Sequence, residues 1–258
     1  MLERLNELER LNENERLLIR NFTSHQIFRD VNRMDWDEFL PILIQRRFLS
    51  KSLINIYEEA IDLLLDDDVK QTVRSLLNEE FVIHSTRGEP LTSHRELLFK
   101  DLLHLGATRQ DILRSSESET TKNTIKECFN ILSQDFNHEY FQVGLITALR
   151  FMTEVLVAEE YKCLWGKMKE RLSPNIPDGN KPRSEFFFFH MIHDERETDV
   201  GQERVVGGAT HAQRLADHIK KLICCEEASS QEEAENYCIL IERQVVEIKY
   251  NFYNQFIF

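Results

Sequence analysis

The stretch FFFFHMIHDERE, residues 186–197, combines an apolar run with a regular series of metal-binding side chains. In a helix, His190, Asp194 and Glu197 occupy positions i, i+4 and i+7, which at about 100° per residue fall within a sector of roughly 60°. One imidazole and two carboxylates then face the same direction, next to phenylalanines that favour burial. Because buried charges are costly unless they are paired or metal-bound, this spacing predicts a helical metal site beside a core.

The remainder of the chain is also typical of helices joined by few loops. Its 258 residues include only eight Gly and five Pro, and no strand-like alternation is long enough to indicate a sheet. We expect one all-α domain over residues 1–258, a bundle of seven to eight helices. The bundle is drawn from helical segments expected over residues 1–20, 35–66 (one or two helices), 69–81, 93–106, 120–134, 138–172, 184–199, 209–224 and 231–253.

Charge and cysteine content narrow the class of protein. The formal net charge of -13 and the lack of a basic stripe argue against a nucleic-acid partner. Five cysteines without a CxxC pair indicate neither a disulfide framework nor a thiolate zinc site. The charged first residues do not resemble a signal peptide, and no apolar run reaches membrane-spanning length. We therefore expect a soluble cytoplasmic protein without a membrane partner.

Leucines recur at helical spacing near the N-terminus, at Leu2, Leu5, Leu8, Leu11 and Leu18. An amphipathic helix packed on its own domain explains them most simply. The alternative is the arm of a coiled-coil homodimer, although fewer than three heptads is short for a stable coil.

Three further donors extend the predicted metal site beyond the opening stretch. Glu80 ends one predicted helix, His94 begins the next, and Glu154 lies within a strongly apolar helix. A carboxylate among apolar residues must be paired, protonated or metal-bound. A pair of metal ions held between helices needs about six such nitrogen and oxygen ligands.

The motifs LLNEEF (76–81), GEPLTSHRELLFKDLLHLG (88–106) and FFFFHMIHDERE, with the lone Glu154 between them, resemble the haem-oxygenase-like diiron oxidases and oxygenases. That family includes the chlamydial death-domain-associating protein, enzymes that oxidise and fragment amino acids, an alkene-forming fatty-acid decarboxylase and N-oxygenases. The resemblance implies a haem-oxygenase-like bundle. It also implies six metal ligands: Glu80, His94, Glu154, His190, Asp194 and Glu197.

The chain departs from the family pattern at two places. Glu197 stands where the HxxxDxxH helix of the family usually ends in His, which makes the site more anionic and leaves the filling of the second metal position open. The gap between Glu80 and His94 is also longer than in the family, so Glu89 is a rival to Glu80 as a ligand.

The activity that the resemblance implies is O2-dependent oxidation of a small organic metabolite, most simply an amino acid or an amino-acid derivative. Two iron ions are the expected cofactor, manganese fits the same ligands, and an external reductant is needed. Haem is disfavoured, since His25 is the only early histidine that could hold it. Arg150, one turn before Glu154, could bind a substrate carboxylate or simply pair with Glu154.

Two functions from other classes remain alternatives. A catalytically altered interaction protein of the same fold would explain Glu197 and the leucine-spaced first helix. The other is a metal-free oxidase or thiamin-salvage-type hydrolase on the same bundle, which the sequence does not support because no cysteine is placed with an acidic or imidazole partner.

Overall fold

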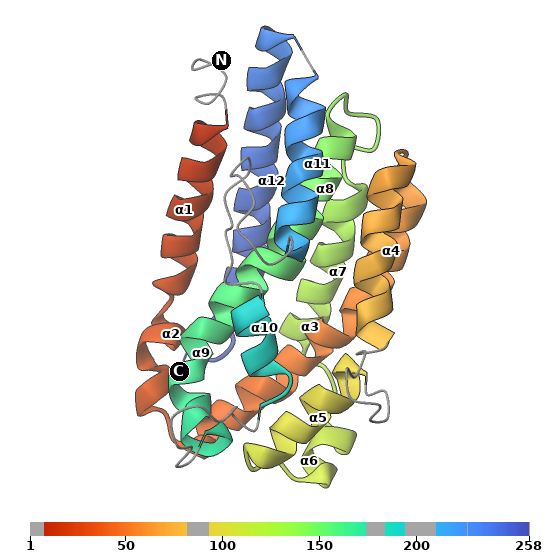
Figure 1. Cartoon of the computed structure of the whole chain (residues 1–258). Coiled ribbons are helices and arrows are strands. Elements are labelled where there is room, and N and C mark those ends of the chain that lie inside the picture. The colour runs from red at the N-terminus through yellow and green to blue at the C-terminus, as the bar shows by residue number, and fades with distance from the viewer. Residues whose placement is uncertain (1–7, 82–92, 174–183, 194–209, 226, 258) are drawn as a thin grey trace.

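The computed structural model describes residues 8–81, 93–173, 184–193, 210–225 and 227–257, and within these ranges it contains helices and no strand (Figure 1). This confirms the expected all-α class. Short helices that the sequence pattern did not predict, α2 and α6, lie between the longer ones. The helices are α1 (Glu9–Thr23), α2 (Gln26–Asp30), α3 (Trp36–Leu63), α4 (Asp67–Phe81), α5 (His94–His104), α6 (Arg109–Arg114), α7 (Glu119–Ser133), α8 (Phe141–Leu149), α9 (Leu156–Leu172), α10 (Phe187–His193), α11 (His211–Cys224) and α12 (Ala228–Asn254).

The long helices pack side by side, and α12 contacts α1, α7 and α8 (Figure 1). Helix α3 packs on α4 and α7, and α11 packs on α8 and α4. The short helix α10 packs on α9. These contacts leave α3, α4, α5, α9, α10 and α11 facing one another, and they enclose the site described below.

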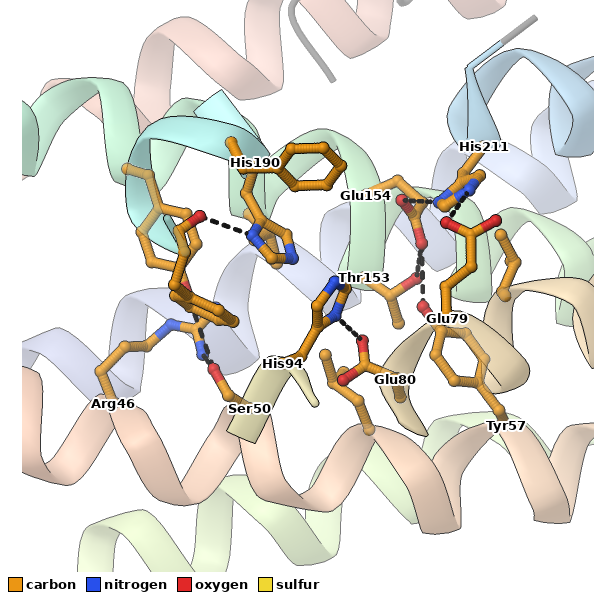
Figure 2. A pocket seen from close by; sticks show the side chains of 16 residues that line it. Arg46, Ser50, Tyr57, Glu79, Glu80, His94, Thr153, Glu154, His190 and His211 are labelled. Carbon is orange, nitrogen blue, oxygen red and sulfur yellow. Dashed lines mark hydrogen bonds and ion pairs between the residues drawn. The ribbon is translucent and has the colours of Figure 1, made fainter. Parts of the chain in front are cut away.

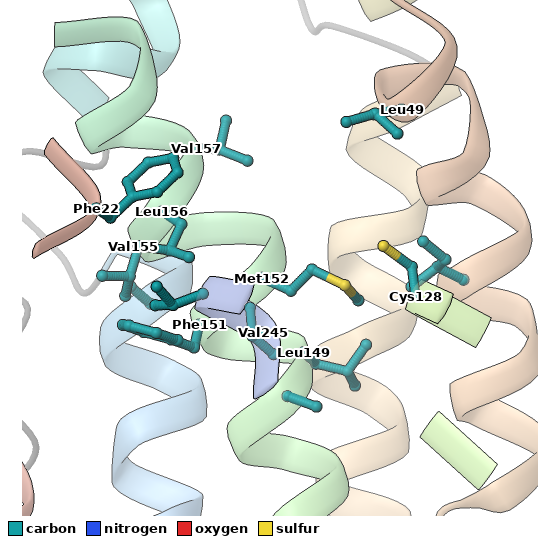
Figure 3. Close-up of a cluster of buried hydrophobic side chains, with 14 of the residues drawn as sticks. Phe22, Leu49, Cys128, Leu149, Phe151, Met152, Val155, Leu156, Val157 and Val245 are labelled. Atoms are coloured by element: carbon teal, nitrogen blue, oxygen red, sulfur yellow. The ribbon is translucent and has the colours of Figure 1, made fainter. Parts of the chain in front are cut away.

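Helices α8 and α9 form one continuous helix, Phe141–Leu172, through the middle of the bundle. Contrary to the expectation from the apolar runs, this helix is long and apolar enough to cross a membrane by length and composition. However, 94% of its most apolar window is buried inside the protein. It is therefore the core helix of the bundle. Its side chains pack against residues from α1, α3, α7 and α12, among them Phe22, Leu49, Cys128 and Val245 (Figure 3).

A π-helical segment, Arg150–Val155, joins α8 to α9. Such segments are rare, widen the helix by one residue per turn, and are frequent at functional sites. Glu154 lies inside this one, so the wide turn coincides with the buried carboxylate that the sequence singled out.

Helix α5 begins and ends where its sequence predicts. The hydroxyl of Ser93 accepts from the N–H of Glu96, and the Glu96 carboxylate accepts from the N–H of Ser93, which is a capping box. Gly106 follows the helix with a φ of 103°, a conformation that favours glycine. The cap fixes the position of His94, the first residue of α5.

Helix α1 packs on its own chain. Leu11, Leu18 and Phe22 are buried, and α1 contacts α12 and α9. This confirms the first interpretation of the leucine pattern for the described residues. Leu2 and Leu5 lie outside them.

Candidate metal centre

A narrow pocket between α3, α4, α5, the π segment, α9, α10 and α11 collects histidine and glutamate side chains (Figure 2). Its enclosed cavity measures about 30 Å³, which is room for a water molecule or an ion. Including the open mouth, the empty space among the lining side chains is about 530 Å³. Arg46 and Ser50 lie at one end of the pocket, Glu154 and His211 lie at the other, and His190 is between them.

Glu80 and His94 face each other across the ends of α4 and α5. His94 Nδ1 lies 3.3 Å from Glu80 Oε1, and both side chains are largely shielded from solvent. The contact between these two atoms is not a hydrogen bond, and the buried Nδ1 has no hydrogen-bond partner within the described part of the chain. An unpartnered buried imidazole nitrogen beside a carboxylate is suited to a cation.

His190 is held by an anchor at the start of α10. The buried Asp101 carboxylate accepts from the backbone N–H groups of Phe186 and Phe187 and from the Ser184 hydroxyl. It thereby satisfies N–H groups that a helix start leaves without partners. The carbonyl of Phe186 lies 2.8 Å from His190 Nδ1. A hydrogen bond from Nδ1–H to that carbonyl makes Nε2 the lone-pair nitrogen, which is the arrangement common in metal-binding histidines.

His190 and His94 stand next to each other, with ring centroids 4.8 Å apart. Phe186 and Phe189 contact both rings and form an apolar wall on that side. The two imidazoles therefore meet in a partly dry environment, where donor groups interact strongly with a cation.

Glu154 is 5% exposed and has fixed partners. Its Oε1 accepts hydrogen bonds from the Tyr57 hydroxyl at 2.8 Å and from the Thr153 hydroxyl at 3.0 Å. Its Oε2 lies 3.5 Å from Nδ1 of His211. Burial would raise the pKa of Glu154, but His211 and the two hydroxyl groups outweigh burial and lower it, so the group is a carboxylate at neutral pH.

His211, the first residue of α11, bridges Glu154 and Glu79. Its Nε2 lies 2.9 Å from Glu79 Oε2. Burial would lower the pKa of His211, but the two carboxylates raise it well above its usual range. In this structure His211 is thus a cation held between two carboxylates. It supplies positive charge at a point where a metal ion would also supply it.

The structure brings four of the six expected ligands to one pocket: Glu80, His94, Glu154 and His190. Asp194 and Glu197 lie outside the described residues, as does the rival Glu89. Within the described ranges, no three His, Cys, Asp or Glu side chains already form a cage around one point. The donors present, carboxylates and imidazoles around an unpartnered His94 nitrogen, nevertheless fit iron or manganese in kind.

Sequence reasoning missed Glu79 and His211. A local signal for His211 exists, because Thr210 caps α11 by accepting from the N–H of Gln213, just as Ser93 caps α5 ahead of His94. A hydroxyl residue followed by His at a helix start therefore occurs twice, and both histidines line the pocket.

Arg150 does not face the pocket, so both interpretations of it were wrong. It is fully buried, its guanidinium donates to both carboxylate oxygens of Glu15, and its Nε donates to the carbonyl of Ala212 at 3.2 Å. Arg150 therefore fixes the first turn of α11, where His211 lies. His25 is also remote from the pocket, since its Nδ1 accepts from the N–H of Ile27 and its Nε2 lies 3.2 Å from Asn254 Oδ1.

The chain is similar in structure to a CADD-like protein of unknown function from Nostoc punctiforme. One crystal structure of that protein superposes with a TM-score of 0.62 at 15% sequence identity, covering 96% of this chain and 97% of the other. A second crystal structure gives 0.59 at 14% identity, covering 96% and 94%. No family model and no curated protein matches the sequence. The structure therefore has the all-helical fold of CADD-like proteins.

Proposed function

We propose that this chain is a cytoplasmic non-haem iron oxidase or oxygenase that uses O2 to oxidise a small metabolite, an amino acid or an amino-acid derivative. The observation that carries the proposal is the pocket, which is lined by three glutamates and three histidines: Glu79, Glu80, Glu154, His94, His190 and His211. Glu154 is buried and Glu80 is largely shielded from solvent, and carboxylates in such places are costly unless cations compensate for them.

Glu80, His94, Glu154 and His190 would hold the metal from the described part of the chain. Asp194 and Glu197 would complete the set by the family resemblance. When bound, two ferrous ions would supply the electrons that reduce O2, with an external reductant to restore them; manganese is the alternative metal.

Other residues of the pocket would orient these ligands and control access of water. Tyr57 and Thr153 hold one oxygen of Glu154, which leaves its other oxygen turned toward His211. Phe186 holds His190 through its carbonyl and covers it with its ring. These contacts to Glu154 and His190 fix the direction from which each side chain would approach a metal ion.

Single-turnover O2 uptake by protein loaded anaerobically with ferrous iron tests the proposal. The wild-type chain is expected to bind iron and consume O2, whereas Glu154→Ala and His190→Ala lose iron and O2 uptake. His104→Ala is the control, because His104 is exposed at the far end of α5 from His94. A chain that binds neither iron nor manganese, or variants that retain full iron content, would contradict the proposal and favour an interaction protein of the same fold.

A further inference from the structure

Arg46 lies at the end of the pocket opposite His211 (Figure 2). It is 2% exposed and belongs to the face of α3 that also carries Ser50, Leu53 and Tyr57. These positions are spaced i, i+4, i+7 and i+11, so they form one stripe along the helix. The stripe runs from Arg46 to Tyr57, whose hydroxyl holds Glu154.

The guanidinium of Arg46 has more donors than protein acceptors. Its Nη1 donates to the Ser50 hydroxyl at 2.8 Å. Its Nε lies 2.8 Å from Glu160 Oε2 and forms an ion pair with it. A guanidinium carries five N–H groups, and in the described part of the chain no acceptor pairs with Nη2.

The charged side chains in direct contact with Arg46 and Glu160 would not repel an anion. Glu160 is the one carboxylate in contact with Arg46 among the described residues, and Glu160 is shared with Lys249, at 3.5 Å, and with the hydroxyl of Tyr253. One carboxylate thus faces two basic side chains, so this cluster has no net negative charge. A second carboxylate beside Arg46 would meet a cation with unused donors.

Two hydroxyl groups stand beside the guanidinium. Tyr161 lies under it, with Arg46 Cζ 5.2 Å from the ring centroid, and the Tyr161 hydroxyl lies 3.4 Å from the Ser50 hydroxyl. Burial raises the pKa of Tyr161 to about 12, so the hydroxyl keeps its proton at neutral pH and can donate.

The basic end of the pocket lies close to the two imidazoles in its middle. The Tyr161 ring is 6.1 Å from the His190 ring, and His190 adjoins His94. Phe186 contacts Tyr161 and His190, which gives an apolar wall from the basic end to the imidazoles. A short molecule with one anionic end would span this distance.

We infer that Arg46, together with the hydroxyl groups of Ser50 and Tyr161, binds the carboxylate of the substrate, so that the substrate is a small organic acid whose reacting carbon lies beside His94 and His190. The position of the reacting carbon beside His94 and His190 rests on the proposed oxidase function, whereas the carboxylate-binding site at Arg46 does not. Arginine suits this task because its planar fork binds both oxygens of a carboxylate.

The test is a calorimetric titration of the metal-free full-length chain with straight-chain acids from propanoate to octanoate and with the matching primary amides. Without metal, a carboxylate cannot bind by coordinating iron. The best acid is expected to bind about tenfold or more tightly than its amide, in line with the strength of hydrogen bonds between charged groups. Equal binding of acid and amide, or no binding of any acid, would overturn the inference.

Matched variants locate the binding. Arg46→Gln is expected to weaken acid binding about tenfold or more and to abolish the preference over the amide. The control is Arg47→Gln, since Arg47 is the next residue but bonds to Ile112 and Ser115 and does not line the pocket. If Arg46→Gln fails to fold because Glu160 loses the nearer of its two cations, Ser50→Ala and Tyr161→Phe replace it, each with an expected severalfold loss and an intact fold.

The outcomes separate this inference from the proposed function. A purely structural Arg46 would lower stability in the variant without changing the ratio of acid to amide affinity. A chain that prefers acids but binds no iron or manganese would contradict the oxidase and leave the subsite standing. A chain that binds iron but does not discriminate acid from amide would contradict the carboxylate-binding site and leave the oxidase proposal standing.

Discussion

Arg150 and Glu154 lie within one wide turn of the same helix, yet they belong to two different kinds of buried cluster. Arg150 pairs with Glu15, and the nearby Glu242 has its pKa raised by burial first and by the charge of Glu15 second, so it is neutral at moderate pH. One positive charge then faces one negative charge. Around Glu154, by contrast, three glutamates line a pocket with a single imidazolium clamped between two of them, because Arg46 at the far end is paired with Glu160. Nδ1 of His94 also has no hydrogen-bond partner among the described residues. The first cluster is complete in itself, whereas the second is suited to a further cation.

The largest effect on stability is expected for a substitution that breaks the ion pair of Arg150 with Glu15. Arg150→Leu leaves Glu15 buried without its partner and should lower the free energy of unfolding by about 3–5 kcal/mol. Urea denaturation of the metal-free protein measures it. Lys122→Met is the control, because Lys122 is exposed and should change stability by less than about 0.5 kcal/mol. A loss below about 1 kcal/mol for Arg150→Leu would show that the two clusters do not differ as described.

The pocket should respond in metal affinity more than in stability. His211→Ala removes a side chain that contacts two glutamates of the pocket, and we expect it to weaken ferrous or manganous binding about 10–100-fold. His218→Ala is the control, since His218 lies on the same helix but bonds to Thr72 outside the pocket. Competition with a chelator of known affinity measures both. Unchanged binding in the two variants would mean that His211 serves only as an internal counter-charge.

Glu242 gives the complete cluster a pH dependence. The pKa of Glu242 is raised in the folded chain, so the folded chain keeps a proton that the unfolded chain releases. The contribution of Glu242 to the free energy of unfolding is therefore intact below the ordinary pKa of a glutamate. It is lost as the pH rises toward the folded pKa. Glu242→Gln should therefore be more stable than wild type at neutral pH, by about 1 kcal/mol, because Glu242 Oε1 also lacks a partner in the described residues. The gain should shrink as pH falls below 5 or so. Thermal unfolding across pH is the measurement, and a gain that grows toward acid would contradict it.

The smallest effect concerns the cap ahead of His211. Thr210→Ala should cost about 0.5–1 kcal/mol in stability and also weaken metal binding, because the cap positions the first turn of α11. Ser118→Ala removes the equivalent cap of α7, away from the pocket, and should cost similar stability without changing metal affinity. Equal metal affinity in both variants would mean that the Thr210 cap does not position the metal-binding residues.

Apolar periodicity predicted the long helices because each buries a continuous stripe. Helices α3, α4, α7 and α12 appear close to their expected bounds. The short helices α2 and α6 were missed, since five or six residues do not display a helical period. Their positions depend on capping and on contacts with distant residues.

The site was predictable to the extent that its residues stand in local motifs. Glu80, His94, Glu154 and His190 do meet in one pocket, but Glu79 and His211 come together only through the packing of α11 on α4, which no local pattern reveals. Arg150 failed for a different reason. Spacing along one helix did not show that Glu15 of α1 lies within reach of Arg150, whereas Glu154 turns to Tyr57 and His211.

We propose that the glutamates and histidines of the pocket bind transition-metal ions. The decisive experiment is anomalous X-ray scattering at the iron edge, from crystals of protein loaded anaerobically with ferrous iron. Strong peaks are expected inside the pocket, within bonding distance of Glu154, His94 and His190. No peak there, or iron bound only at the protein surface, would contradict it.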